Sequence, residues 1–243
     1  MTLDYSDGVA ELKGILLGNQ SRAGQRPGIV LFPDARGIGH HAIECAERLN
    51  ALGFVVLVAD LYGGGDTAPD VAQARELMSE LRSDVARWRA RAEAARHALA
   101  QLEIVDPARM AAIGYCFGGT TALELARSGA PLRAVVTFHG GLASPRPADN
   151  SNIKAKLLIC HGAADKLVPL TQLAGFADAM AATNVDWQVQ IYGGAEHGFT
   201  NPEADDPEIP DHAYHAAADA RSWAAMLSLF EEVLGMPKRR NFG

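Results

Sequence analysis

Cys116 lies in a short motif whose residue types could support nucleophilic chemistry. An apolar run that begins at Met110 leads into Gly114-Tyr115-Cys116-Phe117-Gly118-Gly119, and a helix-forming segment follows at once. Glycines on both sides of a cysteine allow a sharp strand-to-helix turn, because no Cβ atoms crowd the chain there. Such a turn would present the Cys116 sulfur above the carboxyl edge of a sheet. It would also direct the Phe117 backbone N–H at the group that the sulfur attacks.

The motif alone does not separate a nucleophile from a core residue, since free cysteines are among the most buried side chains. A nucleophilic thiol needs a base, and the base needs a third group that orients it. Asp165 and His197 each follow a predicted strand, in the order nucleophile, acid, histidine that is typical of the α/β-hydrolase fold. Singly, they would be a turn residue and a solvated histidine. Together with Cys116 they predict a catalytic triad.

The segment Pro33-Asp34-Ala35-Arg36-Gly37 follows an early predicted strand, where a second oxyanion donor is expected. The N–H groups of Ala35 and Phe117 would then hold the developing negative oxygen. Asp34 and Arg36 would lie at the pocket mouth, with a turn-capping aspartate and a surface arginine as their alternative roles. Tyr62 and Tyr214 are further candidates for the pocket wall, with packing as their alternative role.

Alternating strand and helix patterns must position these residues. Short apolar runs and one alternating segment predict strands at 9–17, 28–32, 54–59, 110–114, 133–138, 156–160 and 187–192. Helical patterns cover 41–52, 71–102 with a break at Ser83-Asp84, 120–127, 170–182 and 211–234. We expect the charges of 71–102 to form a solvated face. Loops are expected at 18–25, 144–152 and 202–210, and a tail at 238–243.

This order predicts an α/β-hydrolase fold for residues 1–243 as a single domain. Its sheet would be doubly wound and mostly parallel, with helices on both faces and no large cap domain. Ligands in such sheets bind beyond the carboxyl ends of the strands, where the candidate residues lie.

Composition limits the possible partners and compartments. Among 243 residues, 22 Lys and Arg against 29 Asp and Glu give a net charge of −7, which argues against binding to nucleic acids or anionic membranes. The three cysteines, Cys45, Cys116 and Cys160, have no Cys-x-x-Cys spacing, which favours a reducing compartment. Neither a signal peptide nor an apolar stretch of spanning length is recognisable, so a cytoplasmic location is expected.

Over nearly its whole length the chain resembles the dienelactone hydrolases. The resemblance is carried by motifs at 32–34 with Gly37, 59–63, 114–119, 161–165 with 168–169, 197–199, and 214–223. It implies a Cys116-Asp165-His197 triad and hydrolysis of a small lactone or ester through a thioester intermediate. It further implies that neither a metal nor a cofactor is needed.

Two positions depart from the best-known members of that family. Asp34 stands where they carry a glutamate that meets the resting thiol, so the charge is kept on a shorter side chain. A nearby carboxylate opposes thiolate formation, which suits a thiol that waits for substrate. Asn201 stands where they carry an arginine that pairs with the substrate carboxylate. An amide offers no cationic fork, so we expect a substrate other than dienelactone itself, with Arg36 as an alternative cation.

Other interpretations are less well supported by the sequence. Cys160 with His161, or His212 with His215, could ligate a metal, but no third ligand has suitable spacing. A thiol-based redox or ligand-sensing protein is the main functional alternative, and an interaction protein without activity is a third. A small molecule is the expected partner, and the chain would be a monomer or a homodimer.

Overall fold

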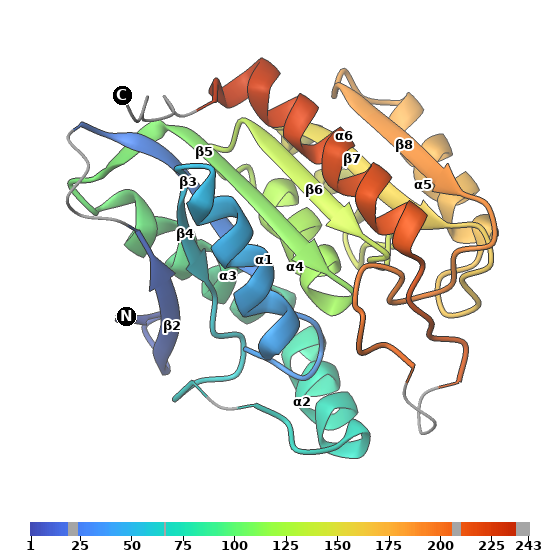
Figure 1. The fold of residues 1–243 in the computed structure, drawn as a ribbon, viewed down its shortest axis with the longest axis horizontal. Helices are drawn as coiled ribbons and strands as arrows, with labels where there is room; N and C mark the ends of the chain where they lie inside the picture. Colours follow the sequence, from blue (N-terminus) through green and yellow to red (C-terminus); the bar gives the residue numbers. More distant parts are fainter. Residues whose placement is uncertain (19–23, 66, 206–209, 237–243) are drawn as a thin grey trace.

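The computed structural model describes residues 1–18, 24–65, 67–205 and 210–236, and these residues form one eight-stranded sheet (Figure 1). The strands are β1 (Thr2–Ser6), β2 (Glu11–Leu17), β3 (Arg26–Phe32), β4 (Val55–Val58), β5 (Val105–Tyr115), β6 (Ala134–Phe138), β7 (Lys156–Gly162) and β8 (Trp187–Tyr192). The helices are α1 (His40–Ala51), α2 (Val71–Ser83), α3 (Val85–Ala100), α4 (Phe117–Arg127), the 3₁₀ helix η1 (Pro147–Asn152), α5 (Leu170–Ala181) and α6 (Ala216–Leu234).

The sheet confirms the predicted α/β-hydrolase fold. Its strand order is β1-β2-β4-β3-β5-β6-β7-β8, with antiparallel pairs only at β1–β2 and β2–β4. The central strands are continuous apolar runs because helices cover both of their faces. One apolar cluster joins the sheet to α1 and α6, and another joins its opposite face to α3, α4 and α5. The carboxyl ends of the parallel strands therefore share one edge.

Helix α2 stands beside these layers and packs chiefly against α3 (Figure 1). No separate cap domain appears in the described part of the chain. The single-domain organisation over 1–243 stays a prediction, because the expected tail and part of the loops at 18–25 and 202–210 lie outside the described residues.

Several element boundaries differ from the predicted ones. Strand β1 was not predicted, and the strand expected at 9–17 begins only at Glu11, after a turn in which Asp7 Oδ1 accepts hydrogen bonds from two backbone N–H groups. The closing helix begins at Ala216 and not at Asp211, because the His215 side chain caps it through the Ala218 N–H. The loop expected at 144–152 contains η1. The predicted break at Ser83-Asp84 is confirmed: Asp84 caps α3 by accepting from the Arg87 N–H at 3.0 Å.

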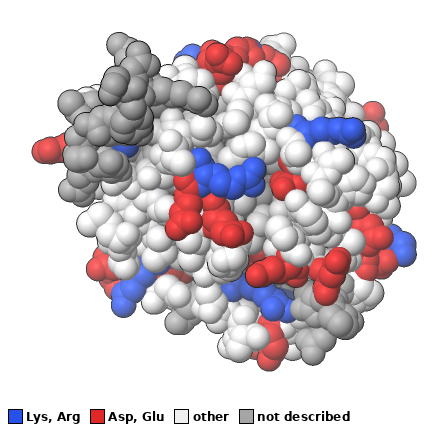
Figure 2. Space-filling view, in the orientation of Figure 1, with Lys and Arg blue, Asp and Glu red and all other residues white. Residues whose placement is uncertain are grey.

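The expectation that the charges of α3 form a solvated face is wrong. Arg89 and Arg91 are buried, and their guanidinium groups pair with Glu124 at 2.7 Å and Asp7 at 2.8 Å. On the face that carries α1 and α6, basic and acidic side chains are interspersed (Figure 2). None of the described helices is long and apolar enough to span a membrane.

Candidate active site

The turn between β5 and α4 has the sharp geometry that its glycines predict. Cys116 has a φ of +52°, in the left-handed region that non-glycine residues rarely adopt. A Cβ at Gly114 would overlap the backbone of Gly118, and a Cβ at Gly118 would overlap the backbone of Phe32. Both glycines are therefore required by close backbone approach, and the cysteine is held at the tip of the turn.

The half-buried Cys116 lines a cavity of 520 Å³ at the carboxyl edge of the sheet. Its backbone N–H donates to the Phe138 carbonyl at 3.0 Å and to Nδ1 of His139 at 3.2 Å. Cys45 and Cys160 are both buried and do not line this cavity. Among the cysteines, Cys116 therefore has the access to a substrate that the nucleophile interpretation requires.

Asp165 and His197 are joined by a hydrogen bond, as the triad requires. The Nδ1–H of His197 donates to Asp165 Oδ2 at 2.8 Å, and the other carboxylate oxygen accepts the N–H groups of Leu167 and Val168. Burial acts to raise the pKa of Asp165, but the His197 ring and the Val168 N–H outweigh it and hold the pKa below its usual value. The carboxylate therefore fixes the ring tautomer, with the Nε2 of His197 as the free basic atom.

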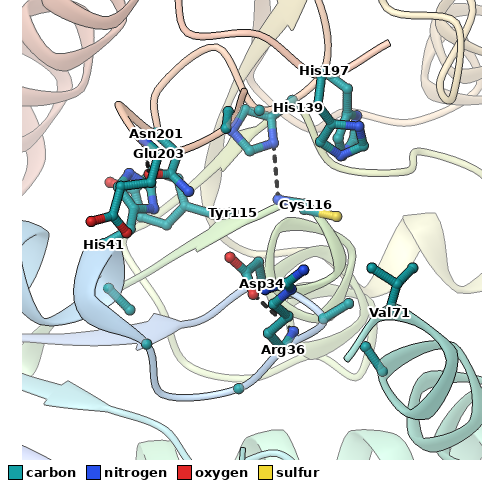
Figure 3. A pocket seen from close by; sticks show the side chains of 18 of the residues that line it. Asp34, Arg36, His41, Val71, Tyr115, Cys116, His139, His197, Asn201 and Glu203 are labelled. Carbon is teal, nitrogen blue, oxygen red and sulfur yellow. Dashed lines mark hydrogen bonds between the residues drawn. The ribbon is translucent and has the colours of Figure 1, made fainter. Parts of the chain in front are cut away.

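The Nε2 atom of His197 is buried and has no hydrogen-bond partner among the described residues. His197 lines the same cavity as Cys116, and Figure 3 shows both side chains on one side of it. Burial disfavours the charged ring, but the Cys116 sulfur and the Asp165 carboxylate outweigh it and raise the pKa of His197 to about 10. Such a ring can hold a proton taken from the thiol.

The loop after β3 lies beside the turn that carries Cys116. Ala35 and Cys116 both line the cavity, and Phe117 opens α4, where backbone N–H groups have no partner within the helix. The Phe117 ring stacks on Trp88 at a centroid distance of 5.3 Å, which fixes the first turn of α4. The assignment of the Ala35 and Phe117 N–H groups as oxyanion donors stays a prediction.

The remaining predicted residues have mixed outcomes. Asp34, Arg36 and Asn201 line the cavity, and burial raises the pKa of the Asp34 carboxyl. Tyr62 and Tyr214 do not line it, which corrects the expectation that they form its wall. The Tyr62 hydroxyl donates to the Ala35 carbonyl at 2.8 Å, and the Tyr214 hydroxyl donates to Asp219 at 3.3 Å.

Several cavity residues were not predicted. Histidines His41, His139 and His212 line it, as does α2 with three apolar side chains and one cation, Val71, Ala74, Met78 and Arg75. One signal in the sequence could have indicated His139: it directly follows a buried strand, as Cys116 does. The α2 wall could not be predicted, because helix periodicity does not reveal that an apolar face borders a cavity.

The residues weighed as metal ligands have other surroundings. Cys160 is buried in β7, and its sulfur accepts from the Tyr192 hydroxyl at 3.9 Å. His215 caps α6, and His212 packs on His197 with ring centroids 4.7 Å apart. Among the described residues, no three His, Cys, Asp or Glu side chains are grouped so that they could hold a metal ion.

Comparison with known proteins gives matches over most of the chain. The profile of the "Dienelactone hydrolase family" matches residues 12–234. The crystal structure of a "Dienelactone Hydrolase-like Promiscuous" phosphotriesterase from metagenomic libraries is 45% identical, with a TM-score of 0.93 over 97% of this chain and 98% of that one. A putative carboxymethylenebutenolidase of Yersinia pestis is 24% identical over 91% of this chain and 84% of its own. An uncharacterised Caenorhabditis elegans protein, K02A2.1, is 36% identical over 58% of this chain and 91% of its own.

Proposed function

Because the chain belongs to the dienelactone hydrolase family and is a lactone or ester hydrolase, we propose that it cleaves its substrates with a Cys116-His197-Asp165 triad. One observation carries this proposal. His197 is hydrogen-bonded to Asp165 through Nδ1, and its Nε2 has no partner in the described ranges of the chain, in the cavity that Cys116 lines. An orienting acid, a free base and an accessible thiol are what acyl transfer needs.

The reaction proceeds in two halves. Cys116 Sγ bonds to the carbonyl carbon while its proton passes to His197 Nε2, and the N–H groups of Ala35 and Phe117 hold the oxyanion. Collapse expels the alkoxide, which takes the proton from His197 and leaves a thioester on Cys116. His197 then removes a proton from water, the resulting hydroxide attacks the thioester, and the carboxylic acid and free thiol are released. A lactone gives one hydroxy acid by the same route.

The side chains that line the cavity limit which ester or lactone can bind, and Asp34 and Asn201 are among them. Both line the cavity, and Asn201 accepts the Glu203 N–H at 3.0 Å through its amide oxygen. From α2, the apolar side chains of Val71, Ala74 and Met78 and the cationic side chain of Arg75 line the cavity. We propose that Asn201 does not bind a substrate carboxylate, since an amide offers no bidentate cation, and that an acidic substrate would pair with Arg36 or Arg75, which both line the cavity.

An aryl phosphotriester is a second candidate substrate, because the solved relative of 45% identity is described as a promiscuous phosphotriesterase. Cys116 would attack phosphorus and expel the aryloxide, and water would then cleave the phosphorus–sulfur bond. The same triad would serve both reactions.

The test is turnover of a panel of lactones, aryl esters and aryl phosphotriesters by the wild type, C116A, D165N and C45A. We expect C116A to lose about 10⁴-fold or more in kcat, and D165N to lose a similar factor through the wrong ring tautomer. C45A, which removes a buried thiol outside the cavity, should stay active. A mass increase equal to the acyl group, on Cys116 of briefly treated wild type, should report the thioester.

Ester turnover by C116A would contradict the triad. Peroxide consumption by the wild type without turnover of any panel member would favour the alternative, a thiol-based redox or ligand-sensing protein.

A further inference from the structure

We propose that His139 is a positioning residue. Its two ring nitrogens hold the turn at Cys116 (the nucleophile turn) and the loop that carries His197 at fixed positions relative to each other. This rests on the proposed function of Cys116 and His197. His139 follows β6 and is 3% exposed, so its ring lies within the protein and forms part of the cavity floor.

The first ring nitrogen of His139 contacts the nucleophile. The Cys116 N–H donates to His139 Nδ1 at 3.2 Å (Figure 3). A backbone N–H can only donate, so Nδ1 must be the unprotonated nitrogen. The hydrogen of the neutral ring is therefore on Nε2.

The second ring nitrogen contacts the loop of the base. Nε2–H of His139 donates to Thr200 Oγ1 at 2.9 Å, and Thr200 lies in the loop that carries His197 and Phe199. The His139 ring also packs edge-on against the rings of His197 and Phe199, at centroid distances of 5.0 and 5.2 Å. One imidazole thus joins the backbone of the nucleophile to the segment that positions its base.

The backbone conformations of Cys116 and His139 indicate what this link stabilises. Cys116 and His139 have φ values of +52° and +44°, and non-glycine residues persist in this region only where their surroundings hold them. The Cys116 N–H is shared between the Phe138 carbonyl and the His139 ring. We infer that the ring helps to keep the turn in the conformation that presents the sulfur.

The link requires a neutral His139. Burial and the nearby rings of His197 and His41 hold the pKa of His139 well below its usual value. A proton on Nδ1 would face the Cys116 N–H and break that contact. It would also place a second cation 5.0 Å from His197, which becomes charged when it takes the thiol proton.

Variants at Thr200 separate positioning from simple loss of packing. T200V removes the acceptor of His139 Nε2–H and keeps the shape of the side chain, whereas T200S keeps the hydroxyl. The matched control is T137V, because Thr137 is buried near the same strand end and its hydroxyl has no hydrogen-bond partner among the described residues. H139N keeps an acceptor for the Cys116 N–H and tolerates a positive φ. H139F removes both contacts.

Three readouts apply to each variant: kcat and KM for an aryl ester, the pH dependence of iodoacetamide alkylation at Cys116, and the melting temperature. We expect T200V and H139N to lower kcat about 10-fold with little change in KM, and to shift the alkylation profile. H139F should lose more than either, T200S should recover most of the rate, and T137V should match the wild type.

Unchanged kcat and alkylation profiles in T200V and H139F, with C116A inactive, would overturn the positioning role and leave the triad intact. A loss of rate in T200V that T137V reproduces, or that only follows the melting temperature, would also overturn it. Activity in C116A would instead overturn the proposed function on which this inference rests.

Discussion

The Ala35 carbonyl accepts a hydrogen bond from a side chain that does not line the cavity. Tyr62 donates its hydroxyl to this oxygen, and the Ala68 N–H donates to the Arg36 carbonyl at 2.9 Å. Tyr62 is itself placed by Asp60, a buried carboxylate that accepts its backbone N–H at 2.9 Å and three other N–H groups nearby. We therefore expect Tyr62 to help to fix the backbone at Ala35, whose N–H is the second proposed oxyanion donor.

We predict that Y62F lowers kcat about 10-fold and leaves KM nearly unchanged. Loss of the hydroxyl lets the loop shift, and a displaced oxyanion donor weakens binding of the transition state more than binding of the substrate. Steady-state kinetics with an aryl ester would measure both parameters. Y214F is the matched control, because its hydroxyl lies outside the cavity and bonds to Asp219. A raised KM with unchanged kcat in Y62F would instead indicate that Tyr62 contacts the substrate.

At the scale of elements, a buried group of charges joins α3, α4 and η1. Glu124 is fully buried in α4, and its carboxylate accepts from Arg89 at 2.7 Å, Arg127 at 2.9 Å and Ser144 at 2.9 Å. Arg127 also donates to Asn150 of η1 at 2.8 Å. Because α4 begins at Phe117, this group anchors the helix that carries the nucleophile turn.

We predict that E124Q lowers the free energy of unfolding by about 3–5 kcal/mol, because two guanidinium groups lose their buried anion. Urea unfolding followed by circular dichroism would measure this. The control is E80Q, which breaks the exposed pair of Glu80 with Arg87 and should cost less than about 1 kcal/mol. Equal effects of the two substitutions would contradict a structural role for the buried group.

These elements also show how far the sequence predicts the molecule. The strand ends that carry Cys116, Asp165 and His197 could be predicted, because buried parallel strands have short apolar runs that end at glycine or polar residues. The burial of Arg89 could not, since its partner Glu124 is distant in the chain and spacing within a helix does not reveal it. The role of His139 could not be predicted either, because its partner Thr200 is also distant in the chain.

At the scale of the whole molecule, burial keeps four histidines in or near the site neutral, whereas His197 has a raised pKa. Burial lowers the pKa of His41 to about 4, and it also holds the pKa values of His139, His161 and His212 below the usual range. In the unfolded chain these rings titrate at about pH 6.5. As the pH falls below that value, these four rings bind more protons in the unfolded state than in the folded state, and they outnumber His197, which acts in the opposite direction because its pKa is raised on folding.

We therefore predict that the melting temperature falls as the pH is lowered from about 7 to about 5, because stability rises with pH wherever the unfolded state holds more protons. H161L should make this fall shallower. His161 is buried and its ring nitrogens make no hydrogen bond of good geometry among the described residues, although the Val168 backbone interacts with the ring and favours its charged form. Scanning calorimetry of the wild type, H161L and the surface control H97Q across this range would measure the slopes. A slope in H161L equal to that of the wild type would show that this ring does not contribute to the acid sensitivity.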